Sequence, residues 1–358
     1  MDSLSLFGLL AVTVMLIFYA LEDRLLNAQH LHNVPGRKTD VADSVWICQL
    51  VEHGLVRASF VPPPEIRRLR DLTRLRKAQT DERTRAVQRL EKVMQDAGIK
   101  LTSVAGQAYS KSARAMLEAL LTGVTDPGEL AELAKARLRS KIPQLREALA
   151  NRFHVDHHGA LVAQLLAHID VLDDAIASLD ARVIERCAPF ADIIELVDTI
   201  PGVARRTAEA LVAECGIDMT RFPTAGHLAS WAGICPGNNA SGGKRRSGHT
   251  RPGSRWLRQA LTEAAWAVAR SKGTYFSSHH AQIAGRRGKT KALGATRHDL
   301  LVAYYHVVRD QVPFEDLGAD WLARRYSVEH RTARLVRQLE ALGHCVTLQP
   351  VAGPDRSH

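Results

Sequence analysis

This sequence lacks the features that would place it among disulfide-stabilised or secreted proteins. Its 358 residues contain five cysteines, and no two of them form a CxxC pair. An odd count without that spacing argues against a disulfide framework or a structural zinc site, and it fits a reducing cytoplasm. The first residues also lack a basic segment and an A-x-A cleavage site, so they do not resemble a signal peptide.

Acidic side chains are nearly missing from one long segment. Between Asn239 and Arg297 there are thirteen Lys and Arg residues but a single acid, Glu263. The net charge of this segment therefore exceeds the +10 of the whole chain. Positive charge concentrated in one block is expected for a surface that contacts a phosphate backbone. The alternative is a solvated surface, although such surfaces usually mix charges of both signs.

Most of the chain has the composition of a globular, largely helical protein. Hydrophobic residues make up 46% and charged residues 24%, and the length suffices for two or three domains. A short strand is predicted at 24–27. Helices are predicted at 40–53, 65–97, 113–121, 127–136, 142–150, 157–187, 255–271 and 296–310, with a polar helix from about 327.

Two of these predicted helices are long and amphipathic. The apolar positions of the first are Leu69, Leu72, Leu75, Val87, Leu90 and Val93. Those of the second are Leu161, Leu165, Ile169, Leu172, Ile176, Leu179 and Val183. Neither helix can bury its own stripe, so the two are predicted to pack together as an antiparallel coiled-coil or bundle arm.

Residues 193–215 show a helix–hairpin–helix pattern. Ile200-Pro201-Gly202-Val203 supplies a tight turn, and a second helix follows it. Such a turn presents backbone N–H groups at a helix N-terminus, where a phosphate binds well. Gly202 and Arg205 are therefore candidate nucleic-acid contacts. An ordinary connection between two bundle helices explains this pattern equally well.

The most suggestive stretch for chemistry is 238–260, where Ser241 stands beside two glycines among many cations. Glycine lets the backbone approach a ligand, and guanidinium groups match phosphate oxygens. The candidate nucleic-acid contacts here are Lys244, Arg245, Arg246, Arg251, Arg255 and Arg258. A second predicted basic loop adds Arg286, Arg287 and Lys289. Taken alone, Ser241 is better explained as an ordinary turn serine.

Five segments in series resemble the transposases of the insertion-sequence-110/1111 family. They are NAQHLHNVPGRKTDVADSVWICQLVEHGLVRASFVPP, IRRLRDLTRLRK, TIPGVARRTAEALVAECG, LASWAGICPGNNASGGKRRSGHTRPGSRWLRQAL and RRGKTKALGATRHDLLVAYYHVVRDQVPFEDLG. The resemblance covers residues 24 to 325 in the family's order and spacing. A series of long motifs is more specific than any single short pattern.

This resemblance implies an enzyme that cuts and rejoins DNA. Family members begin with an RNase H-like domain bearing four acids, Asp-Glu-Asp-Asp. A coiled-coil arm follows, and then a C-terminal domain with a serine thought to attack DNA. The resemblance also implies Mg²⁺ as cofactor, DNA and a guide RNA as partners, a dimer or tetramer, and a cytoplasmic, nucleoid-associated protein.

Three residues carry the family's catalytic roles by this resemblance. Asp40 and Asp43 match the third and fourth acids, and Ser241 matches the nucleophile. Carboxylates at i and i+3 share one helix face and can hold Mg²⁺, which takes oxygen ligands. Without the surrounding motif, acids in a first helical turn would be assigned to compensation of the helix dipole. A serine hydroxyl needs activation by a base, a metal or nearby cations.

The beginning of the chain departs from the family pattern. Only Asp2, Glu22 and Asp23 precede Asn27, and none has a strand context that matches the first two acids. We therefore expect a copy truncated at its N-terminus, which binds nucleic acid but cleaves it poorly. The apolar run 4–21 is long enough to span a bilayer, yet on this interpretation it is fortuitous and membrane residence is not expected.

The expected fold is α+β but mostly helical. Its expected parts are an apolar segment (1–23), a remnant of the RNase H-like domain (24–64), a coiled-coil helical arm (65–190), a C-terminal transposase domain (191–325) and a tail (326–358). Two other functions remain open: a non-catalytic helix–hairpin–helix protein that binds nucleic acid, and a membrane-anchored helical protein.

Overall fold

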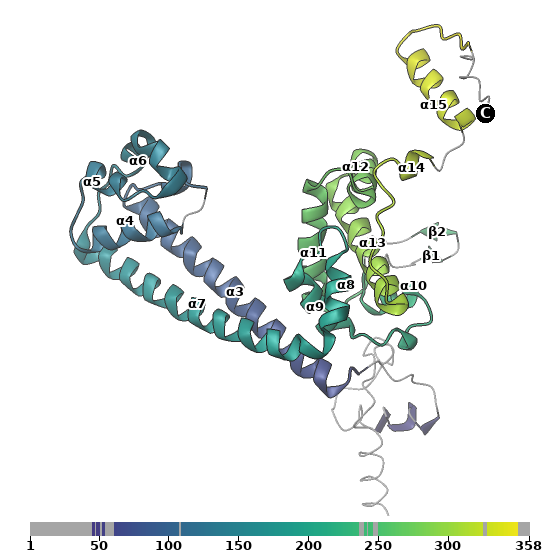
Figure 1. The fold of residues 1–358 in the computed structure, drawn as a ribbon, viewed down its shortest axis with the longest axis horizontal. Coiled ribbons are helices and arrows are strands. Elements are labelled where there is room, and N and C mark those ends of the chain that lie inside the picture. Colours follow the sequence, from purple (N-terminus) through teal and green to yellow (C-terminus); the bar gives the residue numbers. More distant parts are fainter. Residues whose placement is uncertain are drawn as a thin grey trace, which may run out of the picture.

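The computed structural model describes residues 45–46, 48–50, 52–53, 61–106, 109–235, 240–241, 243–245, 250–324 and 328–349. Over these ranges the chain is mostly helical, with one short pair of strands. Figure 1 shows a long two-helix arm that joins a helical body, with the C-terminal helices beyond the body.

Most of the predicted RNase H-like remnant lies outside the described residues, including the strand expected at 24–27, Asp40 and Asp43. The apolar run 4–21, which precedes the remnant, lies outside them too. The described residues of the helix expected at 40–53 are helical up to Glu52. The remnant therefore stays a prediction.

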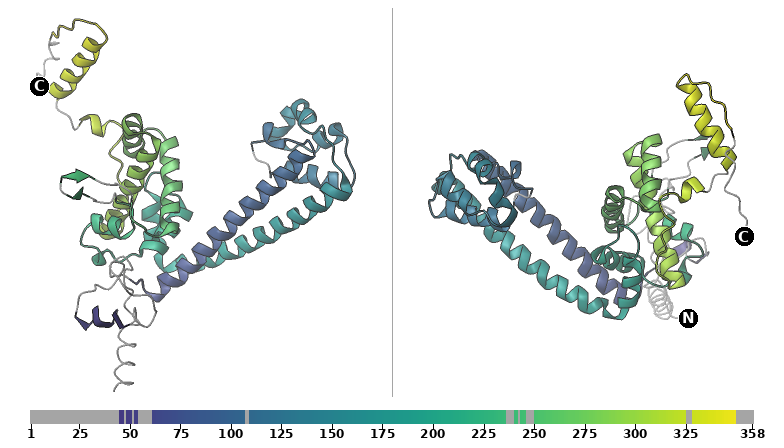
Figure 2. Two further views of the ribbon diagram at one scale, coloured as in Figure 1. Left: turned by 180° about the vertical axis from the view of Figure 1, so that it is seen from behind. Right: turned by 45° about the horizontal axis from the view of Figure 1, so that its top comes forward.

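The arm consists of α3 (Pro64–Asp96) and α7 (Ala160–Cys187). The two helices lie side by side and run in opposite directions (Figures 1 and 2). Proline occupies the first position of α3, where its missing N–H needs no partner. Gly98, at φ +83°, follows its C-terminal end. The two predicted long helices are confirmed, whereas their supercoiling as a coiled coil stays a prediction.

The buried faces of the arm differ from the predicted stripes at two positions. Leu75 is 49% exposed and Leu161 is 44% exposed. On α7 the buried positions are Val162 and Leu166 instead. Each of these is the immediate neighbour of a leucine in the predicted stripe, so the sequence allowed two faces about 100° apart. The packing of α7 against α3 determines which of the two faces is buried.

Three short helices form the tip of the arm: α4 (Lys111–Leu121), α5 (Pro127–Glu132) and α6 (Ile142–Ala148). The hydroxyl of Ser110 caps α4, and the carboxylate of Asp126 caps α5. The prediction of a helix to residue 136 is wrong. The helix α5 ends at Glu132, and Ala136 has φ +51°, which an α-helix cannot accommodate. The tip helices share a core with the outer half of the arm.

The body contains six helices among the described residues. They are α8 (Ala191–Asp198), α9 (Arg205–Cys215), α10 (Ala225–Trp231), α11 (Arg255–Arg270), α12 (Tyr275–Arg287) and α13 (Lys289–Asp310). Tyr304 of α13 is fully buried, and its hydroxyl donates to the carbonyl of Gly216 at 2.7 Å. Ile66 and Leu69 of the arm belong to the same core, so the arm root is built into the body.

A buried ionic cluster also fixes the arm to the body. Arg76 of α3 is 7% exposed and contacts Glu209 of α9 at 2.8 Å and Asp180 of α7 at 3.2 Å. Arg206 forms a further ion pair with Asp180. This cluster explains why the buried face of α3 includes a charged residue that no hydrophobic pattern would select.

Two further helices follow the body, α14 (Trp321–Arg324) and α15 (Val328–Ala341). The polar helix predicted from about 327 is confirmed. Figures 1 and 2 show α15 standing away from the body. Among the described residues, no helix combines the length and apolarity needed to cross a membrane.

Candidate nucleic-acid interface

The two ends of the serine loop, defined here as residues 234–252, cross at a pair of glycines. A Cβ on Gly253 would lie 2.1 Å from the carbonyl oxygen of Ala232, and one on Gly233 would lie 2.7 Å from that of Arg251. Gly233 also has φ +66°. Because neither position has room for a side chain, glycine at both is what allows the base of the loop to close.

A small hairpin occupies the middle of the serine loop. Its strands β1 (Ala240–Ser241) and β2 (Lys244–Arg245) are antiparallel, and Ser241 pairs with Lys244. Gly243 turns the chain at φ +73° and has no neighbour within 4 Å of its missing Cβ. Ser241 therefore flanks the turn of a hairpin that stands off the helical body (Figures 1 and 2). Arg246, a predicted phosphate contact, lies outside the described residues.

Arg258 ties the two ends of the serine loop together. Its guanidinium donates to the carbonyl of Arg251 at 3.0 Å and, more weakly, to that of Gly233 at 3.5 Å. Arg258, which the sequence predicts as a phosphate contact, therefore also has a structural role. Arg251 and Arg255 are exposed. The guanidinium of Arg255 lies 4.5 Å from the ring centroid of Trp256, a stacking that orients the charge.

Ser254, two residues after the serine loop, connects the loop to the arm. Ser254 caps α11 by accepting from the backbone N–H of Leu257, and its hydroxyl donates to Glu214 at 2.7 Å. Glu214 is buried on α9 and binds Arg74 of α3 through two hydrogen bonds, at 2.6 and 2.9 Å. The carboxylate of Glu214 thus links α3, at the root of the arm, to α11, which begins beside the serine loop.

Arg297 of α13 lies close to this region, although the sequence did not single it out. Its guanidinium donates to the hydroxyl of Thr262 on α11 at 3.3 Å. Trp266, one helical turn beyond Thr262, is 44% exposed. The only sequence signal for Arg297 was its position at the end of the basic segment.

The turn of the predicted helix–hairpin–helix packs against protein. Helices α8 and α9 flank it, and Gly202 has φ +85°. A Cβ on Gly202 would lie 2.6 Å from Val268 and 2.8 Å from the carbonyl of Ala264, both on α11. The glycine is therefore required for helix packing. Arg205 is mostly exposed, 3.4 Å from Glu209, and a phosphate role for this turn stays a prediction.

The second basic loop predicted around residues 286–291 is instead a junction between two helices. Helix α12 ends at Arg287, and α13 begins at Lys289 rather than at 296. Gly288, at φ +84°, is the only residue between them. Arg286, Arg287 and Lys289 are all exposed there. A single glycine with positive φ allows the reversal, so no separate loop is needed.

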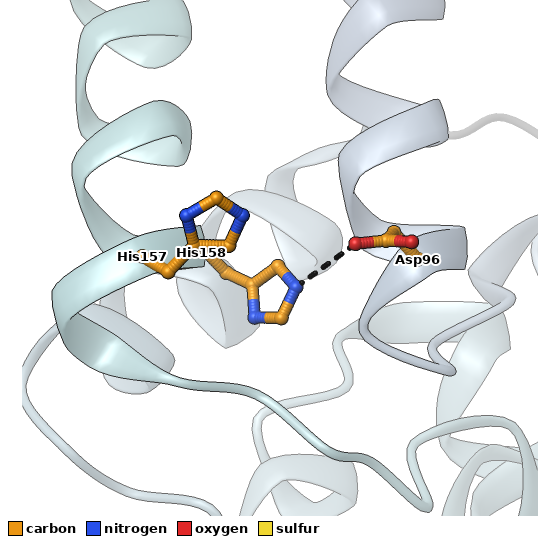
Figure 3. A group of neighbouring side chains, drawn as sticks. All are labelled: Asp96, His157 and His158. Atoms are coloured by element: carbon orange, nitrogen blue, oxygen red, sulfur yellow. Dashed lines mark hydrogen bonds and ion pairs between the residues drawn. The ribbon is translucent and has the colours of Figure 1, made fainter.

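One group of side chains in the described part of the chain has the composition of a metal site. It comprises Asp96, His157 and His158 at the tip of the arm (Figure 3). The Nδ1 atom of His158 accepts from the backbone N–H of His154 at 3.0 Å, so the neutral ring carries its proton on Nε2. Nε2 lies 3.3 Å from Asp96 and donates to it. With both ring nitrogens of His158 in use, its contact with Asp96 links the end of α3 to the segment 155–159 that leads into α7.

The structure therefore brings together some of the predicted residues and separates others. Arg251, Arg255 and Arg258 gather at the base of the serine loop. Ser241, Lys244 and Arg245 lie in the hairpin. Gly202 lies in the turn before α9 and Arg205 at its start, whereas Arg286, Arg287 and Lys289 lie at the α12–α13 junction. Asp40 and Asp43, the predicted metal ligands, lie outside the described residues.

Two models of known protein families match this chain. A family model described as "Transposase IS116/IS110/IS902 family" matches residues 194–281, which include the turn between α8 and α9, the serine loop and α11. A second model, of the IS110 DEDD type and described as "Transposase", matches residues 9–99. The two matches together cover half of the chain. Both describe transposases, and the chain belongs to the IS110 transposase family.

Individual relatives carry related names. The chain is 29% identical over 212 residues to the "Insertion element IS110 uncharacterized 43.6 kDa protein" of Streptomyces coelicolor, covering 55% of this chain and 52% of that protein. It is 32% identical over 149 residues to the "Pilin gene-inverting protein" of Moraxella lacunata, covering 40% of this chain and 46% of that protein. The aligned part thus spans about half the length of these relatives.

Proposed function

We propose that this chain cuts and rejoins DNA, with Ser241 as the nucleophile. The observation that carries the proposal is the construction of the serine loop. Its base is closed by two glycines, its hairpin presents Ser241 beside a turn, and arginines gather at its root. Membership of a transposase family supports the same reaction class.

In the proposed step, the Oγ of Ser241 attacks phosphorus and forms a phosphoserine ester with one DNA end. The Oγ–H bond and the bond from phosphorus to a deoxyribose oxygen break, and the deoxyribose oxygen leaves as a hydroxyl, so the proton lost by Oγ balances the proton gained by the leaving group. The phosphodiester energy is retained in the ester, so attack by a DNA hydroxyl can reverse the step and rejoin the strands. Cations near the loop would stabilise the negative charge that develops on the phosphate oxygens.

The proposed metal ligands are Asp40 and Asp43. Their spacing and carboxylate chemistry fit Mg²⁺, which would supply an electrophile for phosphate oxygens. Family resemblance also suggests a guide RNA, a dimer or tetramer, and nucleoid association. Exposed cations away from the loop, on α9 and at the α12–α13 junction, offer separate surfaces for a second nucleic acid.

The test uses the full chain, Mg²⁺ and DNA carrying ends of the element. Covalent protein–DNA product is measured on denaturing gels, and DNA binding is measured by fluorescence anisotropy. We expect Ser241→Ala to abolish covalent product while DNA affinity stays within about twofold. Ser247→Ala, in the same loop, is the matched control and should keep the product.

The alternative is a protein that binds nucleic acid without catalysis. It predicts DNA binding by the unsubstituted chain and no covalent product under any metal condition, with or without RNA. Covalent product that persists in Ser241→Ala would instead assign the nucleophile to another residue.

A further inference from the structure

Arg297 is a half-buried cation that no carboxylate neutralises in the part of the chain that the structure describes. One N–H of its guanidinium donates to the hydroxyl oxygen of Thr262 at 3.3 Å. That hydroxyl donates its own proton to the carbonyl of Arg258 at 2.6 Å, so Thr262 serves Arg297 as an acceptor only. The Nε atom of Arg297 is buried and makes no hydrogen bond with the described residues.

The surroundings of Arg297 disfavour the charged form of its guanidinium. Burial, and after it the positive charge of Arg258, lower the pKa of Arg297. The serine loop cannot supply a counter-charge, because residues 234–252 contain no Asp or Glu. Glu263, the one acid of the basic segment, pairs with Lys77 at 2.9 Å.

An arginine with a purely structural role in this protein has carboxylate partners. Arg76 is more deeply buried than Arg297, yet it contacts two carboxylates, Glu209 and Asp180. A buried charge without such partners destabilises a fold, and a site that binds an anion is one place where this arrangement serves a function.

We propose that Arg297 and Arg258 form a binding site for a phosphodiester oxyanion at the base of the serine loop. Thr262 holds the guanidinium plane of Arg297, which leaves other N–H groups to donate to phosphate oxygens. Arg258 places the site at the loop because it binds the carbonyls of Arg251 and Gly233. Trp266, one helical turn beyond Thr262 on α11, is 44% exposed, so its ring is available to stack on a base or sugar of the bound strand.

That the bound phosphate belongs to DNA rests on the proposed function. The existence of the anion site does not depend on it. The bound phosphate is one that the strand presents to the serine loop, so Arg297 is expected to position the DNA next to Ser241. This role predicts an unusual signature, in which removal of the residue strengthens the fold and weakens binding.

The first test is thermal unfolding with inorganic sulfate as the probe. Arg297→Met keeps the side-chain length and removes the charge. At low salt without sulfate, we expect its melting temperature to lie about 2 °C or more above that of the unsubstituted chain. Added sulfate should then stabilise the unsubstituted chain clearly more than this variant. Arg89→Met, an exposed arm cation outside the site, should change neither quantity.

The second test is DNA binding in the Ser241→Ala background, which removes any covalent step. Arg297→Met should weaken duplex binding about fivefold to tenfold and reduce the salt dependence by roughly one phosphate contact. Arg297→Lys should recover part of the affinity, because it keeps the charge but loses the planar fork.

A purely structural role predicts the opposite pattern and would overturn the inference. Arg297→Met would then unfold at a lower temperature and respond to sulfate as the unsubstituted chain does. If the unsubstituted chain forms no covalent product but Arg297→Met still loses the sulfate response and DNA affinity, the nucleophile proposal fails while the anion site stands.

Discussion

The α-carbon of Gly253 faces the carbonyl of Ala232 so closely that a Cβ would lie 2.1 Å from its oxygen. This contact joins the segment that enters the serine loop to the segment that leaves it. Arg258 reinforces the same junction from α11. The position of the hairpin carrying Ser241 therefore depends on a backbone contact outside the hairpin itself.

Gly253→Ala is expected to disrupt the base of the serine loop. The added methyl meets backbone atoms, so the segments must separate, and we expect a loss of about 1–3 kcal/mol in the free energy of unfolding. Ser241-dependent covalent product should fall by at least about tenfold. Urea unfolding and denaturing gels measure the two effects. Gly285→Ala is the control, because its site in α12 is open and alanine favours helix by about 0.5–1 kcal/mol.

Ser254→Ala tests the connection from the arm to the loop. It removes the cap of α11 and the hydrogen bond to Glu214, and should cost about 1–2 kcal/mol in unfolding free energy. Ser110→Ala removes a comparable cap from α4 at the arm tip. We expect both variants to lose stability, but only Ser254→Ala to reduce covalent product under conditions where both are folded. Equal product from the two would show that the Glu214 link has no effect on the site.

Arg76→Met tests the anchoring of the arm. The substitution leaves Glu209 buried without its partner at 2.8 Å, so unfolding free energy should fall by about 3–5 kcal/mol. The double variant Arg76→Met/Glu209→Met should recover much of that loss, because both charges are then absent. Arg146→Met breaks an exposed pair with Glu132 and should cost less than about 1 kcal/mol. Denaturant titration compares all three.

His280 predicts a dependence of stability on pH. The ring is buried in α12, and its Nδ1 lies 2.9 Å from the hydroxyl of Thr296, which donates to Ala292. Burial lowers the pKa of His280 below its ordinary value near 6.5. The unfolded chain therefore binds this proton more readily than the folded chain. The stabilising effect is complete above about pH 6.5 and is lost as the pH falls through the folded pKa.

The measurement is the difference in unfolding free energy between the unsubstituted chain and His280→Gln across the pH range below neutrality. We expect the difference to shift against the unsubstituted chain as the pH falls below about 6.5. A difference that is independent of pH would contradict the assignment, since glutamine does not titrate.

Local patterns were sufficient for most of the helices. The 33-residue helix α3 begins at Pro64 and ends two residues before Gly98, and both signals are visible in the sequence. The failures occurred where helix signals compete with turns. Lys289 and its neighbours were predicted as a basic loop, because the chain reverses between α12 and α13 at a single residue, Gly288. The helix α5 was predicted too long, because alanine at position 136 is not a residue type that indicates a turn.

The candidate site was predictable only in part. The glycines and cations around Ser241 marked the loop, and the series of motifs identified the family. Glu214 and Arg297 were missed because their importance comes from partners far away in the chain, Arg74 and Ser254 for the first and Thr262 for the second. Neither an ion pair between distant residues nor an unpaired, half-buried charge produces a periodic pattern in the sequence.

The amino-acid sequence alone determined the helical arm, the basic segment, the serine loop and the transposase family, because each follows from local spacing or from motifs in series. Tertiary structure decided which faces are buried and which cations are free. Arg76 and Arg297 are both arginines in predicted helices, yet one has two carboxylate partners and the other has none among the described residues. Packing of distant helices sets that difference, since it fixes which charges meet and which are left to bind a ligand.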